Sequence, residues 1–106
     1  MKLYISGPIA RMPDRNVRAF NNAERLLRSL GFDIVNPVNL PVVPEWTHRE
    51  YLSRDIPLML GCNGVATLYN PTDSRGMKAE MTTAVCCGMD VRPVRWWVWR
   101  KKLGKI

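Results

Sequence analysis

Short apolar runs alternate along the chain with longer segments in which apolar residues recur every three or four positions. The short runs predict β-strands, because strands are short and are bounded by glycine, proline and polar turn residues. Four strands are predicted in this way, at residues 2–6, 32–36, 65–69 and 91–94.

The segments between these runs have helical periodicity. The first predicted helix extends from Val17 to Leu30, the second from about Thr47 to Leu60 and the third from Met77 to Cys87. Because proline lacks the N–H that a helical hydrogen bond needs, Pro57 is expected to kink or restart the second helix.

This order of elements predicts a single α/β domain with a doubly wound, Rossmann-like or flavodoxin-like sheet of four to five mostly parallel strands. Ligands of such sheets bind beyond the carboxyl ends of the strands. The loops after Ser6, Asn36 and Tyr69 are therefore expected to meet at one crevice. The domain is expected to cover residues 1–95, followed by a Trp-rich basic extension at residues 96–106.

Composition narrows the class of protein. A chain of 106 residues holds one domain with a thin core, so a homodimer or larger homo-oligomer is expected. No apolar run is long enough for a membrane span or a signal peptide, and the three cysteines form a poor disulfide framework. We therefore expect a cytoplasmic protein. No Cys and His residues have metal-ligand spacing, so neither a metal nor a cofactor is expected.

The net charge of +7 favours an anionic partner such as a nucleotide, nucleic acid or acidic lipid, without choosing among them. A basic surface that only keeps the protein in solution is the simpler explanation.

Glu80 is a candidate for chemistry. It lies at the edge of the apolar stripe of the third predicted helix, one turn from Met77 and Ala84 and close to the preceding loop. Burial would raise the pKa of this carboxyl, whereas the helix N-terminus favours the anion. An ionised and poorly hydrated carboxylate is a usable nucleophile. The simpler alternative is a glutamate that only complements the helix dipole.

Residues before the same helix suggest an anion site. Ser74 and Gly76 offer a hydroxyl and backbone N–H groups at a helix N-terminus. Helix capping by Ser74 or Asp73 is the simpler explanation and needs no ligand. The loop after the first strand repeats the theme with Gly7, Arg11 and Arg15.

Asp55 and Tyr4 extend the list of candidates. Asp55 precedes Ile56-Pro57 and is either the cap of a restarted helix or a second carboxylate that faces the crevice. Tyr4 lies on the first strand, where an aromatic residue is ordinary, but its hydroxyl could bond a catalytic carboxylate. The combination of these residues is a stronger signal than any one of them.

Taken in order, these motifs resemble the nucleoside 2-deoxyribosyltransferase superfamily. The resemblance covers residues 2–95, is closest to the small phage and bacterial subgroup, and extends to the deoxynucleoside 5′-monophosphate N-glycosidases. The matching motifs are Tyr4-Ile5-Ser6-Gly7-Pro8-Ile9, a helix with Phe20, Ala23, Leu27 and Gly31, then Val35-Asn36-Pro37, Tyr51 with Asp55, and Ser74-x-Gly76-x-x-x-Glu80-x-x-x-Ala84.

The resemblance implies a role for each matching residue. Glu80 would attack the anomeric carbon of the sugar, Asp55 would assist departure of the base, and Tyr4 would orient the nucleophile. Relatives that act on monophosphates carry a serine at the position of Ser74. The implied substrate-binding and phosphate-binding residues are Ser6, Gly7, Pro8, Ile9, Arg11, Ser74 and Gly76.

The sequence departs from the family pattern at a few positions. Asn63 stands where relatives usually carry aspartate, Asn70-Pro71 replaces an aromatic-containing loop, Arg11 comes one position late, and Pro57 is unusual inside its helix. These departures leave open the identity of the substrate and whether the protein is active.

The implied function is cleavage or transfer of the N-glycosidic bond of a 2′-deoxynucleoside or its 5′-monophosphate, through a covalent glycosyl intermediate on Glu80. Water as the acceptor makes the protein a hydrolase, and a second nucleobase makes it a transferase. The alternative is a catalytically inactive module that binds or senses nucleotides.

Trp96, Trp97 and Trp99 lie among basic residues in the C-terminal extension, as aromatic residues do in single-strand binders. The preferred interpretation is an edge strand whose tryptophans pack in a subunit interface, followed by a frayed basic end. Neither nucleic acid nor a membrane is therefore an expected partner.

Overall fold

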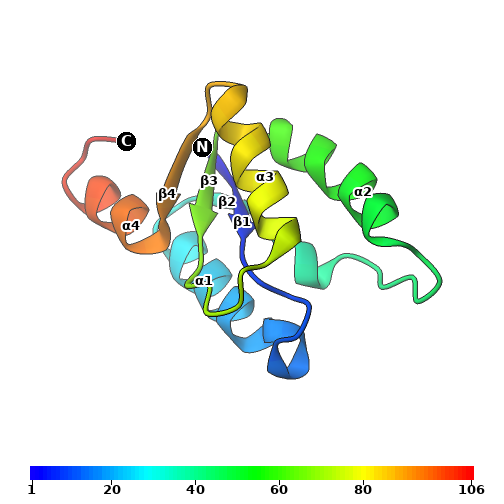
Figure 1. Ribbon diagram of the computed structural model, residues 1–106. Helices are drawn as coiled ribbons and strands as arrows, with labels where there is room; N and C mark the ends of the chain where they lie inside the picture. Colours follow the sequence, from blue (N-terminus) through cyan, green and yellow to red (C-terminus); the bar gives the residue numbers. More distant parts are fainter.

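Four parallel strands form one sheet in the order β2-β1-β3-β4 in the computed structural model, which describes residues 1–106 (Figure 1). This confirms the predicted α/β fold with a parallel sheet. The strands are β1 (Lys2–Ser6), β2 (Asp33–Val35), β3 (Gly64–Thr67) and β4 (Asp90–Pro93).

Three of the helices lie within two residues of their predicted bounds, and a fourth was not predicted. They are α1 (Val17–Ser29), α2 (His48–Leu60), α3 (Arg75–Cys86) and α4 (Val94–Lys102), with short 3-10 segments at Pro13–Asn16 and Pro37–Asn39. The expectation that Pro57 restarts the second helix is wrong, because α2 continues through it. None of the helices has the length and apolar character that crossing a bilayer requires.

Residue alternation along the central strand β1 separates two apolar layers. Leu3 and Ile5 face a cluster that includes Phe20 and Leu27 of α1. Tyr4 faces the opposite way, into a smaller cluster with residues of α2 and α3. Figure 1 shows α2 and α3 together on one side of the sheet, with α1 and α4 elsewhere around it. Side chains on alternate positions of β1 therefore reach different helices.

The segment predicted as a possible edge strand is the helix α4, so that interpretation is wrong. Trp97 is 2% exposed and belongs to the main core cluster. Its indole N–H donates to the carbonyl of Val65 at 3.0 Å and to that of Arg92 at 3.2 Å. A Cβ atom on Gly64 would lie 2.5 Å from the Trp97 ring, so this strand position needs glycine. The boundary predicted after residue 95 stays a prediction.

Two tryptophans of α4 give a matched test of this packing. Trp97→Ala should lower the free energy of unfolding by about 3–5 kcal/mol, because it empties a buried site and removes an indole hydrogen bond. Trp99 is 54% exposed on the same helix, so Trp99→Ala should change it by less than about 0.5 kcal/mol. Urea unfolding followed by circular dichroism measures both, and equal losses would contradict this account of α4.

Candidate functional site

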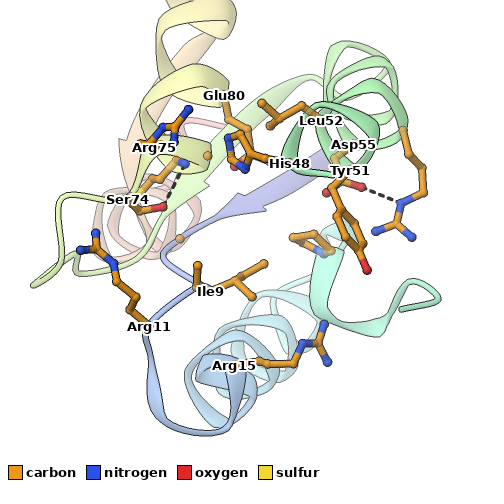
Figure 2. Close-up of a pocket in the computed structure, with 16 residues that line it drawn as sticks. Ile9, Arg11, Arg15, His48, Tyr51, Leu52, Asp55, Ser74, Arg75 and Glu80 are labelled. Carbon is orange, nitrogen blue, oxygen red and sulfur yellow. Dashed lines mark hydrogen bonds and ion pairs between the residues drawn. The ribbon is translucent and has the colours of Figure 1, made fainter. Parts of the chain in front are cut away.

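A cavity of about 630 Å³ opens at the carboxyl ends of the strands, where sequence analysis expected a crevice. Its walls come from the loop after β1, from α2, and from the start of α3. Figure 2 shows Arg11 and Ser74 on one side of this cavity, Asp55 and Tyr51 on the other, and Glu80 and His48 between them.

Glu80 lies in the second turn of α3 and is 6% exposed. Its carboxylate accepts a hydrogen bond from the hydroxyl of Tyr4 and another, at 2.8 Å, from the hydroxyl of Ser6. Tyr4 and Ser6 are two residues apart on β1, so both side chains leave the same face of the strand. The carboxylate of Glu80 is thus held between a strand and a helix at the inner end of the cavity.

Burial raises the pKa of Glu80 to about 7, although the hydrogen bonds from Tyr4 and Ser6 oppose that rise. The nearby charge of Asp55 adds to the increase. Burial and the carboxylate of Glu80 raise the pKa of Tyr4 far above its ordinary value, so Tyr4 is a neutral donor. Glu80 therefore changes its charge near neutral pH, while the hydroxyls of Tyr4 and Ser6 that donate to it stay neutral.

Asp55 lines the cavity from α2 and is 7% exposed. The guanidinium of Arg54 donates to its carboxylate at 2.8 Å and also to the carbonyl of Pro41. The same guanidinium lies 5.4 Å from the ring centroid of Trp46 and 5.3 Å from that of Tyr51. Arg54 therefore links the cavity carboxylate of Asp55 to the proline-rich loop before α2.

Tyr51 makes a second link to this loop. Its hydroxyl donates to the carbonyl of Val43 at 2.7 Å and accepts from the N–H of Val43 at 2.9 Å. The loop is thus attached to α2 at two places, beside the wall that carries Asp55.

Ser74 caps α3, since its hydroxyl accepts from the N–H of Met77 at 3.2 Å. The capping explanation therefore holds, and Ser74 and Gly76 also line the cavity. N–H groups in the first turn of a helix have no intrahelical acceptor and favour an anion. Arg11 and Arg75 line this end of the cavity and take part in none of the salt bridges.

The loop after β1 has a strained backbone where it meets the cavity. Arg11, Asp14, Arg15 and Asn16 have φ values of 64°, 49°, 53° and 59°, which are uncommon for residues other than glycine. The side-chain amide of Asn16 donates to the carbonyl of Pro8 at 3.0 Å and supports the turn. Strain of this kind is found at ligand sites, where surrounding contacts hold it.

The structure brings most of the predicted site residues together. Seven of the predicted residues line the cavity: Gly7, Ile9, Arg11, Asp55, Ser74, Gly76 and Glu80. Tyr4, Ser6 and Pro8 are fully buried and do not line it. Ser6 was expected to bind substrate, but its hydroxyl is used by Glu80.

Arg15, which the sequence placed with Arg11 in the first loop, also lines the cavity, and the sequence did not single out several other lining residues, among them His48, Leu52, Arg54 and Arg75. His48 is the first residue of α2, and its ring lies 3.3 Å from where a Cβ atom of Gly76 would be. Two helix N-termini therefore meet at the cavity. The capping residue Thr47 marks the start of α2, but no local signal shows that α3 begins beside it. No three His, Cys, Asp or Glu side chains are grouped as metal ligands would be.

Two departures from the family pattern have structural partners. The backbone N–H of Lys2 donates to the side chain of Asn63 at 2.7 Å, at the amino end of the sheet and away from the cavity. The side-chain oxygen of Asn70 accepts from the N–H and the hydroxyl of Thr72, both at 3.1 Å, and shapes the loop before Ser74. Neither residue takes the place of a group in the cavity.

The fold is similar to those of two solved structures. One is the 2-deoxyribosyltransferase of the psychrotolerant bacterium Bacillus psychrosaccharolyticus, with a TM-score of 0.69 and 20% identity over 86% of this chain and 69% of that chain. The other is the 2-deoxyribosyltransferase of Leishmania mexicana, with a TM-score of 0.67 and 19% identity over 85% of this chain and 61% of that chain. At these identities the likeness concerns the fold.

None of the curated proteins matches this sequence. The finer parts of the resemblance, the subgroup and the relation to N-glycosidases, stay predictions. Residues 1–92 match the family described as "Domain of unknown function (DUF4406)", and the chain therefore belongs to that family.

Proposed function

We propose that the protein cleaves or transfers the N-glycosidic bond of a 2′-deoxynucleoside 5′-monophosphate, with Glu80 as the nucleophile. The observation that carries this proposal is the buried carboxylate of Glu80, bonded to Tyr4 and Ser6 and facing a cavity that it shares with Asp55. The likeness in fold to two 2-deoxyribosyltransferases supports the reaction class.

In the proposed reaction the ionised carboxylate of Glu80 attacks the anomeric carbon as the bond to the base breaks. The electron pair of that bond leaves with the base, which takes a proton from Asp55. Water or a second base then attacks the glycosyl ester, returns the proton to Asp55 and frees Glu80. Burial favours this chemistry because it removes the water that would shield the nucleophile.

The opposite end of the cavity suits a 5′-phosphate. The first turn of α3 presents N–H groups at Ser74 to Gly76, and Arg11 and Arg75 line the same end of the cavity without forming a salt bridge. Arg11 is nevertheless close to the exposed carboxylate of Asp73, since Lys78 and, to a smaller extent, Arg11 lower the pKa of that group. A phosphate there and a base near Tyr51 would set the sugar beside Glu80, which lies between them (Figure 2).

The alternative function is nucleotide binding without chemistry. It is favoured by the ion pair of Asp55 with Arg54, which engages one oxygen of the proposed acid. If that pair persists with ligand bound, Asp55 accepts a hydrogen bond and delivers no proton. Calorimetric binding of a deoxynucleotide with no base release on long incubation would support this alternative.

Glu80→Gln should abolish release of base from deoxynucleoside monophosphates, because an amide cannot form the glycosyl ester. The expected loss in kcat is at least about a thousandfold, measured by chromatography of the free base with and without an acceptor base. Glu45→Gln is the matched control, since this exposed carboxylate does not line the cavity. Unchanged base release by Glu80→Gln would refute the proposed nucleophile.

The rate should rise as pH increases through about 7, because the nucleophile is the ionised form of Glu80 and the pKa of Glu80 is about 7. Ser6→Ala removes a hydrogen bond that lowers this pKa, so the midpoint of its kcat/KM profile should lie at higher pH. A profile that falls across this range would contradict the assignment.

The same titration should appear in stability. The pKa of Glu80 is about 7 in the fold and 4.5 for a free side chain, so the folded state binds more protons between these values. This group therefore stabilises the fold fully below pH 4.5, and its contribution of about 3 kcal/mol is lost as pH rises through 7. The unfolding free energies of wild type and Glu80→Gln are measured in urea across this pH range, and the difference between them isolates the contribution of Glu80.

Substitutions of Ser74 separate phosphate binding from capping. Aspartate and threonine both cap helices, but only Ser74→Asp places a negative charge where the phosphate is proposed. Ser74→Asp should therefore raise KM for the monophosphate by roughly tenfold or more and leave KM for the nucleoside nearly unchanged. Ser74→Thr is the control, and equal effects of both variants on both substrates would exclude a phosphate at this end.

A further inference from the structure

The positive charge of the chain is concentrated at its C-terminal end. All nine carboxylates lie at or before Asp90, whereas six of the sixteen Lys and Arg residues follow it. Residues 1–90 are therefore nearly neutral, and the net charge of +7 arises almost entirely in residues 91–106. None of the salt bridges includes a residue of this segment. Its cations have no internal counter-ion.

Two of these cations share one aromatic ring. The guanidiniums of Arg92 and Arg100 lie over Trp96, at 4.9 and 5.3 Å from its ring centroid. The Nε atom of Arg100 is buried and has no hydrogen-bond partner. Two like charges on one ring repel each other, and the N–H of Arg100 needs an acceptor. A phosphate bound at the surface would offset the repulsion between the two guanidiniums.

Two further cations flank Trp99 on α4. Arg95 precedes Trp99 by four residues and Lys102 follows it by three, so the three side chains share one face of α4. All three are exposed, and the indole of Trp99 is 54% exposed. Trp99 thus lies between two cations along the axis of α4, whereas Trp96 lies between Arg92 of β4 and Arg100 of α4.

We propose that α4 binds single-stranded nucleic acid, with phosphates at its guanidinium and ammonium groups and a base stacked on Trp99. The interleaving of cations and indoles matches a polymer in which phosphates and flat bases alternate. A duplex buries the faces of its bases, so it cannot use Trp99 in this way. The packing of Trp97 fixes α4 against the sheet and keeps this surface preformed.

An anionic membrane is the less suitable partner. Helices that lie in a membrane interface present a continuous apolar face. The exposed large apolar residues of α4 and its C-terminal flank are only Trp99 and Leu103, and Trp97 is held in the protein core.

The nucleic-acid surface is separate from the catalytic cavity. No residue after Glu80 lines that cavity, and Figure 1 shows α4 and α2 at opposite ends of the molecule. Loss of binding at α4 should therefore leave base release from monophosphates unchanged, so the two proposals fail independently.

Fluorescence polarisation of the full chain with labelled oligothymidylate and oligouridylate tests the proposal. Trp99→Ala should weaken binding by roughly tenfold, because it removes a stacked base, whereas Trp99→Phe should retain most of the affinity. Reversing Arg95 and Lys102 to glutamate should reduce the slope of log K against log salt by about 1.4. The DNA and RNA probes identify which strand is preferred.

Reversal of Arg18 and Arg25 to glutamate is the control, because these exposed residues of α1 give the same change in net charge. An equal loss in this control would overturn the proposal, since it would reduce binding to a general charge effect. So would unchanged affinity of Trp99→Ala, equal or tighter binding of a duplex, or binding to phosphatidylserine vesicles but not to either oligonucleotide.

Discussion

The buried carboxylate of Glu80 is the constraint on which the rest of the site depends. Burying a charge is unfavourable unless hydrogen bonds compensate, and here two hydroxyls of the central strand β1 do so only in part, since the pKa of Glu80 is raised to about 7. An apolar residue would fill this position at lower cost to stability. The same hydrogen bonds attach α3 to β1 and fix the position of its N-terminus at the cavity.

The charges around the cavity are arranged about this group. Four arginines and two carboxylates line it, and only Arg54 is paired, with Asp55. The end that contains Arg11 and Arg75 is therefore positive, whereas the interior holds the carboxyls. A ligand with one anionic end and a neutral reacting centre matches this division, because its anion is attracted to the positive end while its reacting centre lies beside Glu80 in the interior.

The spacing of apolar residues predicted the fold because it reflects which side chains are buried. The three predicted helices and four predicted strands lie close to their observed bounds. The same spacing placed Tyr4 on the first strand, but it could not say which helix covers the face from which Tyr4 projects. The hydrogen bond of Arg54 to the preceding loop and the approach of His48 to α3 depend on how α2 packs in the fold, which local periodicity does not specify. The run Trp96–Trp99 has residues with a high strand propensity. In the fold it is part of the helix α4, from which the side chain of Trp97 packs against Gly64 of β3.

Salt acts differently on Glu80 and on the cations of α4, because the carboxylate is buried and the cations are exposed. Glu80 is 6% exposed, so dissolved ions screen its interactions with Tyr4, Ser6 and Asp55 only weakly. The cations beside Trp99 are exposed and act through solvent, where the Debye length at physiological ionic strength is about 8 Å. The proposed binding at α4 is therefore sensitive to ionic strength, whereas the charge of Glu80 is set by pH. Ionic strength therefore leaves the charge of Glu80 nearly unaltered, although the exposed Arg11 and Arg75 at the mouth of the cavity are screened as the cations of α4 are.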